Sequence, residues 1–198
     1  MPKVVDHEQR RRELGRALWQ VIRQQGIDGA SVRSVAREAG WSPSSVQYYF
    51  TTQSDLLAFA MRMISEVLRR APTRSTLPPD PRDAAQEALE RMLPMESELR
   101  AVAEVWVAFL SRTLVDDEAR RINRGGHEHL SRTCRRLLDE LAANGMLAEG
   151  LDLRLEADRL HVLMDGMVLH AVTAPDLMPP ERLRAVLHRQ LTSLLAKD

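Results

Sequence analysis

The chain has 198 residues, of which 44% are hydrophobic and 28% charged, a balance that is ordinary for a globular protein. It has no apolar run near the ~20 residues that a membrane span needs, its first residues lack the apolar core of a signal peptide, and its single cysteine excludes an internal disulfide. We therefore expect a cytoplasmic protein that does not enter a membrane.

A formal net charge of zero argues at first against a nucleic-acid partner. The charge is unevenly distributed, however, because basic residues outnumber acidic ones between Met1 and Phe50, with a cluster at Arg10–Arg12. Phosphate neutralisation is local, so a neutral chain with a basic end can still bind DNA.

Apolar spacing predicts an all-α chain of about nine helices, since no stretch alternates with period two. The first helix has Leu14, Ala17, Leu18, Val21 and Ile22 on one face and ends at Gly26. A short second helix lies between an N-cap at Ser31 and Gly40. A third begins after Ser42, with Pro43 at its first position, and is expected to end at 50–52.

Further helices are predicted beyond this point. A fourth carries Leu56 to Leu68, and a proline-rich loop from Ala71 to Pro81 follows it. The remaining helices are expected at about 84–93, 95–114, 116–143, 152–173 and from 180 onward. Gly125 and Gly126 are expected to interrupt or bend the long one.

The two short helices and the glycine between them are typical of a helix-turn-helix. The second helix of this motif must be seated on one side and polar on the other to enter the major groove. Val46 and Phe50 provide the seat, because they are four residues apart. Polar side chains such as Gln47 remain for DNA, and glutamine can bond adenine with two hydrogen bonds.

Three segments resemble the N-terminal domain of tetracycline-repressor (TetR) family regulators, namely Ser31–Ser42, Val46–Phe50 and Asp55–Leu57. Gln47–Phe50 and Met164–Met167 further resemble the BetI-like branch. The resemblance implies a DNA-binding domain at residues 1–52 and a helical ligand-binding and dimerisation domain at 53–198. The expected DNA contacts are Arg33, Ser34, Ser42, Pro43, Ser44, Ser45, Gln47, Tyr48, Tyr49, Thr52 and Gln53.

The chain departs from the usual family pattern at several of these positions. The family has glycine in place of Ser44, tyrosine in place of Gln47 and a lysine in place of Gln53, where the lysine reaches a phosphate. Trp41 replaces a smaller aliphatic residue in the turn. These departures put one backbone contact in doubt and leave the operator sequence open.

The resemblance also implies a homodimer formed by the last two helices of each subunit. Broad apolar stripes on both helices favour burial across a partner, and His161 and Asp165 are spaced to pair within or across that interface. The expected interface residues are His161, Asp165, Met167, Val168, Leu183, Val186, Leu187, Gln190, Leu191 and Leu194.

A small-molecule cavity is the last feature that the resemblance implies. Methionine adapts to irregular shapes, which suits a permissive pocket. The expected lining is Met61, Met92, Met95, Trp106, Phe109, Leu110 and Met164. No charged residue stands out as an anchor, so the effector's class stays open.

Catalytic and metal-binding motifs are absent from the sequence. His127 and His129 are two positions apart, on roughly opposite sides of a helix, so they cannot share a metal there. No cofactor and no metal are expected. The sequence predicts a regulator that is not an enzyme, with a repressor released from operator DNA by a small molecule favoured over an activator. The alternative is a small helical ligand-binding protein or enzyme with a vestigial helix-turn-helix.

Overall fold

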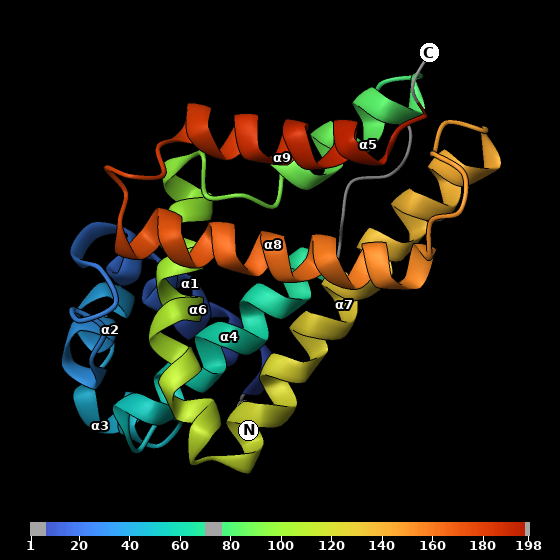
Figure 1. Ribbon diagram of the computed structural model, residues 1–198. Coiled ribbons are helices and arrows are strands. Elements are labelled where there is room, and N and C mark those ends of the chain that lie inside the picture. Colours follow the sequence, from blue (N-terminus) through green and yellow to red (C-terminus); the bar gives the residue numbers. More distant parts are fainter. Residues whose placement is uncertain (1–6, 70–76, 197–198) are drawn as a thin grey trace. The chain divides into compact units, whose positions relative to one another are not determined.

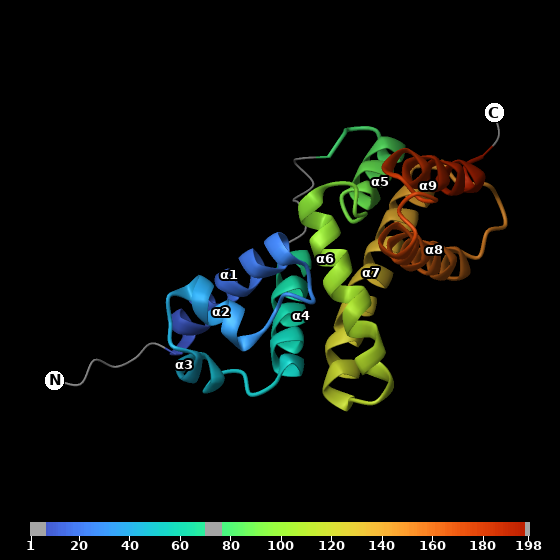
Figure 2. The same ribbon diagram turned by 90° about the vertical axis from the view of Figure 1, so that its left-hand side faces the viewer.

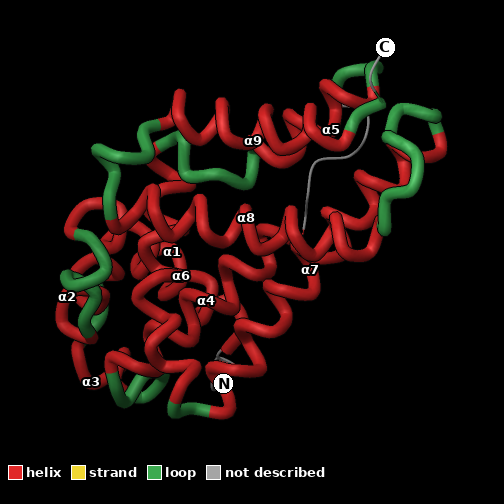
Figure 3. The backbone as a smooth tube through the Cα atoms, viewed as in Figure 1, coloured by secondary structure: helices red, strands yellow, loops and turns green. Residues whose placement is uncertain are grey.

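The computed structural model describes residues 7–69 and 77–196, which form helices and loops without a strand (Figure 3). One isolated antiparallel bridge joins Leu147 to Leu195. The all-α prediction is thereby confirmed. Residues 70–76 of the predicted loop lie outside the described part. None of the described helices has both the length and the apolarity that crossing a bilayer requires.

The helices are labelled in Figure 1 in chain order. Their bounds are α1 His7–Gln25, α2 Val32–Ala39, α3 Pro43–Gln47, α4 Gln53–Arg69, α5 Pro81–Glu90, α6 Ser97–Leu110, α7 Asp117–Ala143, α8 Leu153–Thr173 and α9 Pro180–Leu194.

Local capping chemistry explains where four of these helices begin, namely α2, α3, α5 and α8. The side chains of Ser31, Ser42, Asp80 and Asp152 each accept hydrogen bonds from backbone N–H groups of the first turn that follows. Gly40 ends α2 with a φ of 67°, a left-handed conformation that glycine adopts without strain.

Three details differ from the sequence prediction. The helix α3 ends at Gln47 rather than at 50–52, and the predicted helix 95–114 is divided into α6 and a 3₁₀ turn at Ser111–Leu114. The helix α7 runs through Gly125 and Gly126 without interruption. Glycine destabilises a helix by about 1 kcal/mol relative to alanine. Buried residues of α7 on both sides of the pair, such as Ala119 and Cys134, offset this cost through their packing.

The chain divides into two compact units, one of residues 1–68 and 104–123 and the other of 69–103 and 124–198. The predicted boundary at residue 52 does not coincide with the limits of these units, and it stays a prediction.

The first unit is built on α1. Buried side chains on one face of α1, among them Leu14, Leu18 and Ile22, form its core together with Val35 of α2 and Leu56 of α4. In Figure 2 the helices α1 to α4 form a group around this core.

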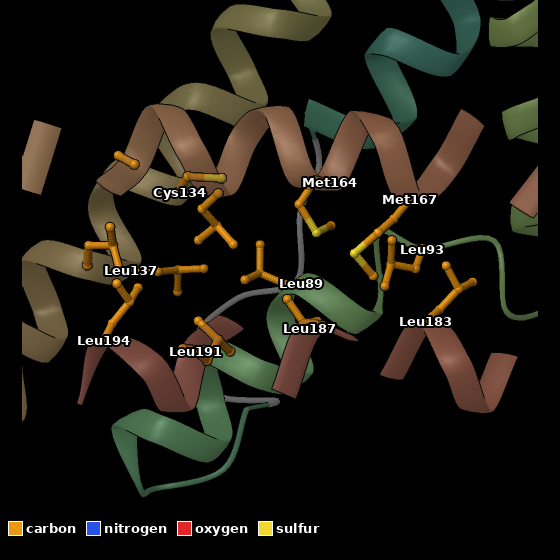
Figure 4. Packing of buried hydrophobic residues seen from close by; sticks show 14 of the residues in the cluster. Leu89, Leu93, Cys134, Leu137, Met164, Met167, Leu183, Leu187, Leu191 and Leu194 are labelled. Carbon is orange, nitrogen blue, oxygen red and sulfur yellow. The ribbon is translucent and has the colours of Figure 1, made fainter. Parts of the chain in front are cut away.

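The second unit has a core made by α5, α7, α8 and α9 and by Leu93, which follows α5 (Figure 4). Leu89 and Leu93, Leu137, Met164 and Leu187 meet there with other apolar side chains. The helices α8 and α9 lie side by side in Figures 1 and 2 and contact each other directly. The apolar stripes on these two helices therefore face each other within one chain.

Arg184 of α9 forms an ion pair with Glu90, the last residue of α5, at the edge of this core. Its Nε donates a hydrogen bond to Glu90 Oε2 at 3.2 Å, and its Nη2 lies 3.7 Å from Met95 Sδ. Because the arginine is largely exposed, we assign this ion pair at most about 1 kcal/mol.

Candidate nucleic-acid interface

The helix α2 is fixed by its buried face and by a reciprocal cap. Val35 and Ala36 are almost fully buried. The backbone N–H of Ser34 donates to Ser31 Oγ at 3.1 Å, and the backbone N–H of Ser31 donates to Ser34 Oγ at 2.9 Å. The Ser34 hydroxyl itself lies 2.7 Å from the Gly29 carbonyl, to which it can donate. Ser34 is 8% exposed, and its hydroxyl stabilises the beginning of α2 through these bonds.

The helix α3 is seated by the two residues that the sequence analysis identified. Val46 is 0% exposed and Phe50 is 3% exposed, and the Phe50 ring packs against Phe59 of α4 with ring centres 4.9 Å apart. A five-residue helix has too few internal hydrogen bonds to be stable alone. Its position therefore depends on this anchor.

The opposite face of α3 is open to solvent. Tyr48 is 77% exposed, although it is a large aromatic residue. Tyr49 is partly buried, and its ring meets the edge of the Tyr48 ring at 5.3 Å. The other exposed residues of the predicted contact set are Arg33, Ser42, Pro43, Ser44, Ser45, Gln47 and Thr52.

Three serine hydroxyls meet at the beginning of α3. Ser42 Oγ accepts from the backbone N–H of Ser45 at 3.2 Å and lies 2.7 Å from Ser45 Oγ and 3.0 Å from Ser44 Oγ. A helix N-terminus carries partial positive charge, and hydroxyls at such a position can donate to phosphate oxygens. This end of α3 is therefore suited to a phosphate of the DNA backbone.

Trp41 has a positioning role that the sequence analysis did not recognise. Its ring lies in the turn between α2 and α3, with the guanidinium carbon of Arg10 at 5.2 Å on one side and the Tyr49 ring at 6.2 Å on another. It therefore links α1, the turn and the end of α3. The sequence indicates that Trp41 is unusual in this turn, but only the fold identifies Arg10 and Tyr49 as its partners.

The start of α4 is also capped. Asp55 Oδ2 accepts from the backbone N–H groups of Thr51 and Thr52 at 3.0 and 2.8 Å, and Thr52 Oγ1 accepts from the Asp55 N–H at 3.1 Å. Gln53 begins α4, and its side chain lies outside the described residues.

The predicted dimer residues on α8 and α9 differ in how deeply they are buried. Buried in the core of their own chain are Met167, Leu183, Leu187, Leu191 and Leu194. Val168 and Val186 pack against that core but are partly exposed, as is Gln190. The spacing of apolar residues could not separate the two groups, because both follow the same helical period.

An exposed apolar stripe runs along α8. Leu155, Val162 and Leu169 are 55%, 71% and 37% exposed and recur at intervals of seven residues. A neighbouring groove is lined by Leu163 of α8 and by α9 residues that include Val186 and Gln190. The Nε2 atom of Gln190 is buried there with no hydrogen-bond partner.

The predicted pocket residues divide between the two units. Met61, Trp106, Phe109 and Leu110 belong to the first, where Trp106 Nε1 donates to Asn123 Oδ1 at 3.1 Å. The second contains Met92, Met95 and Met164, all of which pack in its core.

His161 and Asp165 pair within one chain, and a third residue joins them. His161 Nε2 lies 3.5 Å from Asp165 Oδ2, and His127 Nδ1 of α7 lies 3.3 Å from the same oxygen. Burial raises the pKa of the Asp165 carboxyl above its ordinary value, while the two histidines act in the opposite direction.

Family models match most of the chain. Residues 16–60 match the model for bacterial regulatory proteins of the tetR family, and residues 81–196 match the C-terminal part of BetI-type transcriptional repressors.

Individual relatives and structures agree with these matches. The HTH-type transcriptional regulator PksA of Bacillus subtilis is 34% identical over 202 residues, covering 100% of this chain and 96% of that protein. The regulator BetI of Vibrio campbellii is 28% identical, covering 98% and 96%. A transcriptional regulator from Rhodococcus has 29% identity and a TM-score of 0.74, covering 93% and 95%. A regulator from Saccharomonospora viridis, crystallised with choline, shares the fold with 20% identity and a TM-score of 0.83, covering 96% and 100%.

Proposed function

The chain belongs to the tetR family of bacterial regulatory proteins, and from this premise we propose how its own residues perform repression. As a member it is a ligand-responsive, DNA-binding transcriptional regulator that acts as a homodimer, and it is not an enzyme. The alternative, a ligand-binding protein or enzyme with a vestigial helix-turn-helix, is not favoured. We place its action in the cytoplasm, where operator DNA lies.

The observation that carries the proposal is the division of α3 into a buried and an exposed side. Val46 and Phe50 hold the helix, while Gln47 and Tyr48 extend into solvent. Gln47 reads a base edge, and the serines at the start of α3 contact phosphates. The proposed contact set is the predicted one without Ser34, whose hydroxyl is used inside the chain.

A change at Gln47 and Tyr48 tests this proposal. Each base contact is worth about 1–3 kcal/mol, and a dimer makes it twice, so the pair Gln47→Ala and Tyr48→Ala lowers affinity by about thirtyfold or more. The measurement is fluorescence anisotropy with duplexes from the DNA beside the protein's own gene. The control is Gln24→Ala, on the exposed side of α1. Equal binding by the double variant and the control would refute the proposal.

For the dimer, we propose that Val162 and Leu169 of α8 meet the partner subunit together with the rim of the groove at Val186 and Gln190. The other residues of the predicted interface on these helices are buried in the core and pack behind this surface, namely Met167, Leu183, Leu187, Leu191 and Leu194. An unpartnered Gln190 amide supports the same assignment, because a partner can supply the hydrogen bond that the single chain lacks.

The effector is a small molecule that binds the helical part at 53–198 and favours a conformation with lower operator affinity. Choline is the first compound to test, because the C-terminal part is of BetI type and a regulator of the same fold was crystallised with choline. A compound that binds the folded dimer raises its melting temperature. An effector must in addition release the operator in the anisotropy assay.

A further inference from the structure

Three potential metal ligands meet between α7 and α8 in the second unit. His127 Nδ1 lies 3.2 Å from His161 Nε2 and 3.3 Å from Asp165 Oδ2, and His161 Nε2 lies 3.5 Å from the same oxygen. These are the described residues that form a cluster able to hold a metal ion. The helix-turn-helix belongs to the first unit and makes no use of them.

Hydrogen bonding alone explains this triangle poorly. A neutral imidazole has one N–H, so hydrogen atoms cannot satisfy all three contacts at once. The two distances to the carboxylate, 3.3 and 3.5 Å, are also long for charge-assisted bonds, which are about 2.7–2.9 Å. A cation in the middle would contact a lone pair of each atom.

The dimensions of the triangle agree with one face of a tetrahedral site. Zinc lies about 2.0–2.1 Å from nitrogen and oxygen ligands, so the edges of its tetrahedron are about 3.3–3.4 Å. The observed edges, 3.2, 3.3 and 3.5 Å, lie on both sides of that value. An octahedral ion at the same distance has shorter edges of about 3.0 Å.

We propose that His127, His161 and Asp165 bind a divalent transition-metal ion of the zinc class through Nδ1, Nε2 and Oδ2. Two imidazoles and one carboxylate suit such an ion better than magnesium or calcium, which prefer oxygen. The side chains are 40%, 16% and 29% exposed, which leaves the fourth position to water or to a donor atom of a ligand. The sequence predicts no metal here because His127 and His129 lie on roughly opposite sides of a helix, whereas His161, which lies beside His127 in the structure, is 34 positions further along the chain.

The test is calorimetric titration of the tag-free, full-length protein with Zn²⁺ after treatment with a chelator. We expect one ion per chain. His127→Gln and Asp165→Asn each weaken binding by more than about a hundredfold, since loss of even an outer partner of a ligand costs 10–100-fold. His129→Gln, two residues away on α7, is the matched control and binds as the wild type does.

Wild-type protein that takes up no Zn²⁺, or variants that bind it like the control, would overturn the proposal. Circular dichroism of the variants without metal establishes that they are folded. Should either variant fail to fold, nitrogen NMR of the wild-type histidines decides the matter. Zn²⁺ must then shift His127 Nδ1 and His161 Nε2, and unshifted signals would equally overturn the site.

Discussion

The guanidinium carbon of Arg10 lies 5.2 Å from the centre of the Trp41 ring, which joins the first helix to the turn of the helix-turn-helix. A cation–π contact at an exposed site is worth about 0.5–1 kcal/mol. Trp41→Ala removes this contact together with the packing on Tyr49. We expect it to lower both stability and operator affinity, measured by thermal unfolding and by anisotropy.

Arg10→Ala isolates the contribution of the cation in that contact. It should lower stability by about 0.5–1 kcal/mol, whereas Arg11→Ala, its exposed neighbour, should leave stability unchanged. Equal effects of the two arginine changes would show that the Arg10–Trp41 contact does not stabilise the turn.

Ser34→Ala should reduce stability without changing the DNA contacts. It removes a hydroxyl that serves the Ser31 N–H and the Gly29 carbonyl, and loss of a helix cap typically costs about 1 kcal/mol. Urea unfolding measures the change. Operator affinity of the folded variant stays near that of the wild type, and a large loss of affinity would restore Ser34 to the contact set.

Cys134 should be unreactive in the folded protein. Burial raises the pKa of its thiol to about 12, so almost no thiolate forms at pH 8. A thiol reagent should label the protein only after unfolding in guanidinium. The folded state holds the thiol proton more tightly than the unfolded state does. The contribution of the Cys134 thiol to the free energy of unfolding is therefore fully present below the ordinary pKa of 9.0, and it is lost as the pH rises toward 12. Rapid labelling of the native protein would contradict this account.

Asp116 caps α7, and its contribution should disappear in acid. Its carboxylate accepts from the backbone N–H groups of Ala119 and Glu118, with Arg112 nearby, and these partners lower its pKa below 3.8. A carboxyl whose pKa is lower in the folded state stabilises the fold at any pH above its pKa in the unfolded chain. This stabilisation is lost as the pH falls through the pKa of the folded state. Wild type and Asp116→Ala should therefore differ more in urea unfolding at pH 6 than at pH 3. If the two proteins differed as much in unfolding free energy at pH 3 as at pH 6, the negative charge of Asp116 could not be the cause of the difference.

Val162→Glu should dissociate the dimer. A charge at the centre of an apolar contact loses its hydration without gaining a partner. Sedimentation velocity should give a monomer for this variant and a dimer for Val115→Glu, a control on an exposed valine of the first unit. A dimeric Val162→Glu would place the interface elsewhere.

The features that sequence predicted well are those that depend on neighbouring residues. The caps at Ser31 and Ser42, the stop at Gly40 and the seat formed by Val46 and Phe50 each involve residues at most a few positions apart. The composition and period of the helices likewise predicted the all-α fold.

The features that sequence missed depend on which elements meet. The apolar period of α8 marks Met167 as buried but does not tell whether its own chain or a partner covers it. Ser34 has the same polarity as Ser44, yet only the path of the preceding loop brings the Gly29 carbonyl to its hydroxyl. Similarly, His127 of α7 lies beside His161, which belongs to another helix, α8.

The five-residue length of α3 has a consequence for how such a regulator can change over generations. Its order comes from the buried Val46 and Phe50 and from the Ser42 cap, whereas Gln47 is exposed and is no part of the core. In the contact set that we propose, mutations at Gln47 therefore retarget the protein to new promoters with little loss of stability. Novel specificity is accessible here by single steps, each of which leaves a folded molecule for selection to act on.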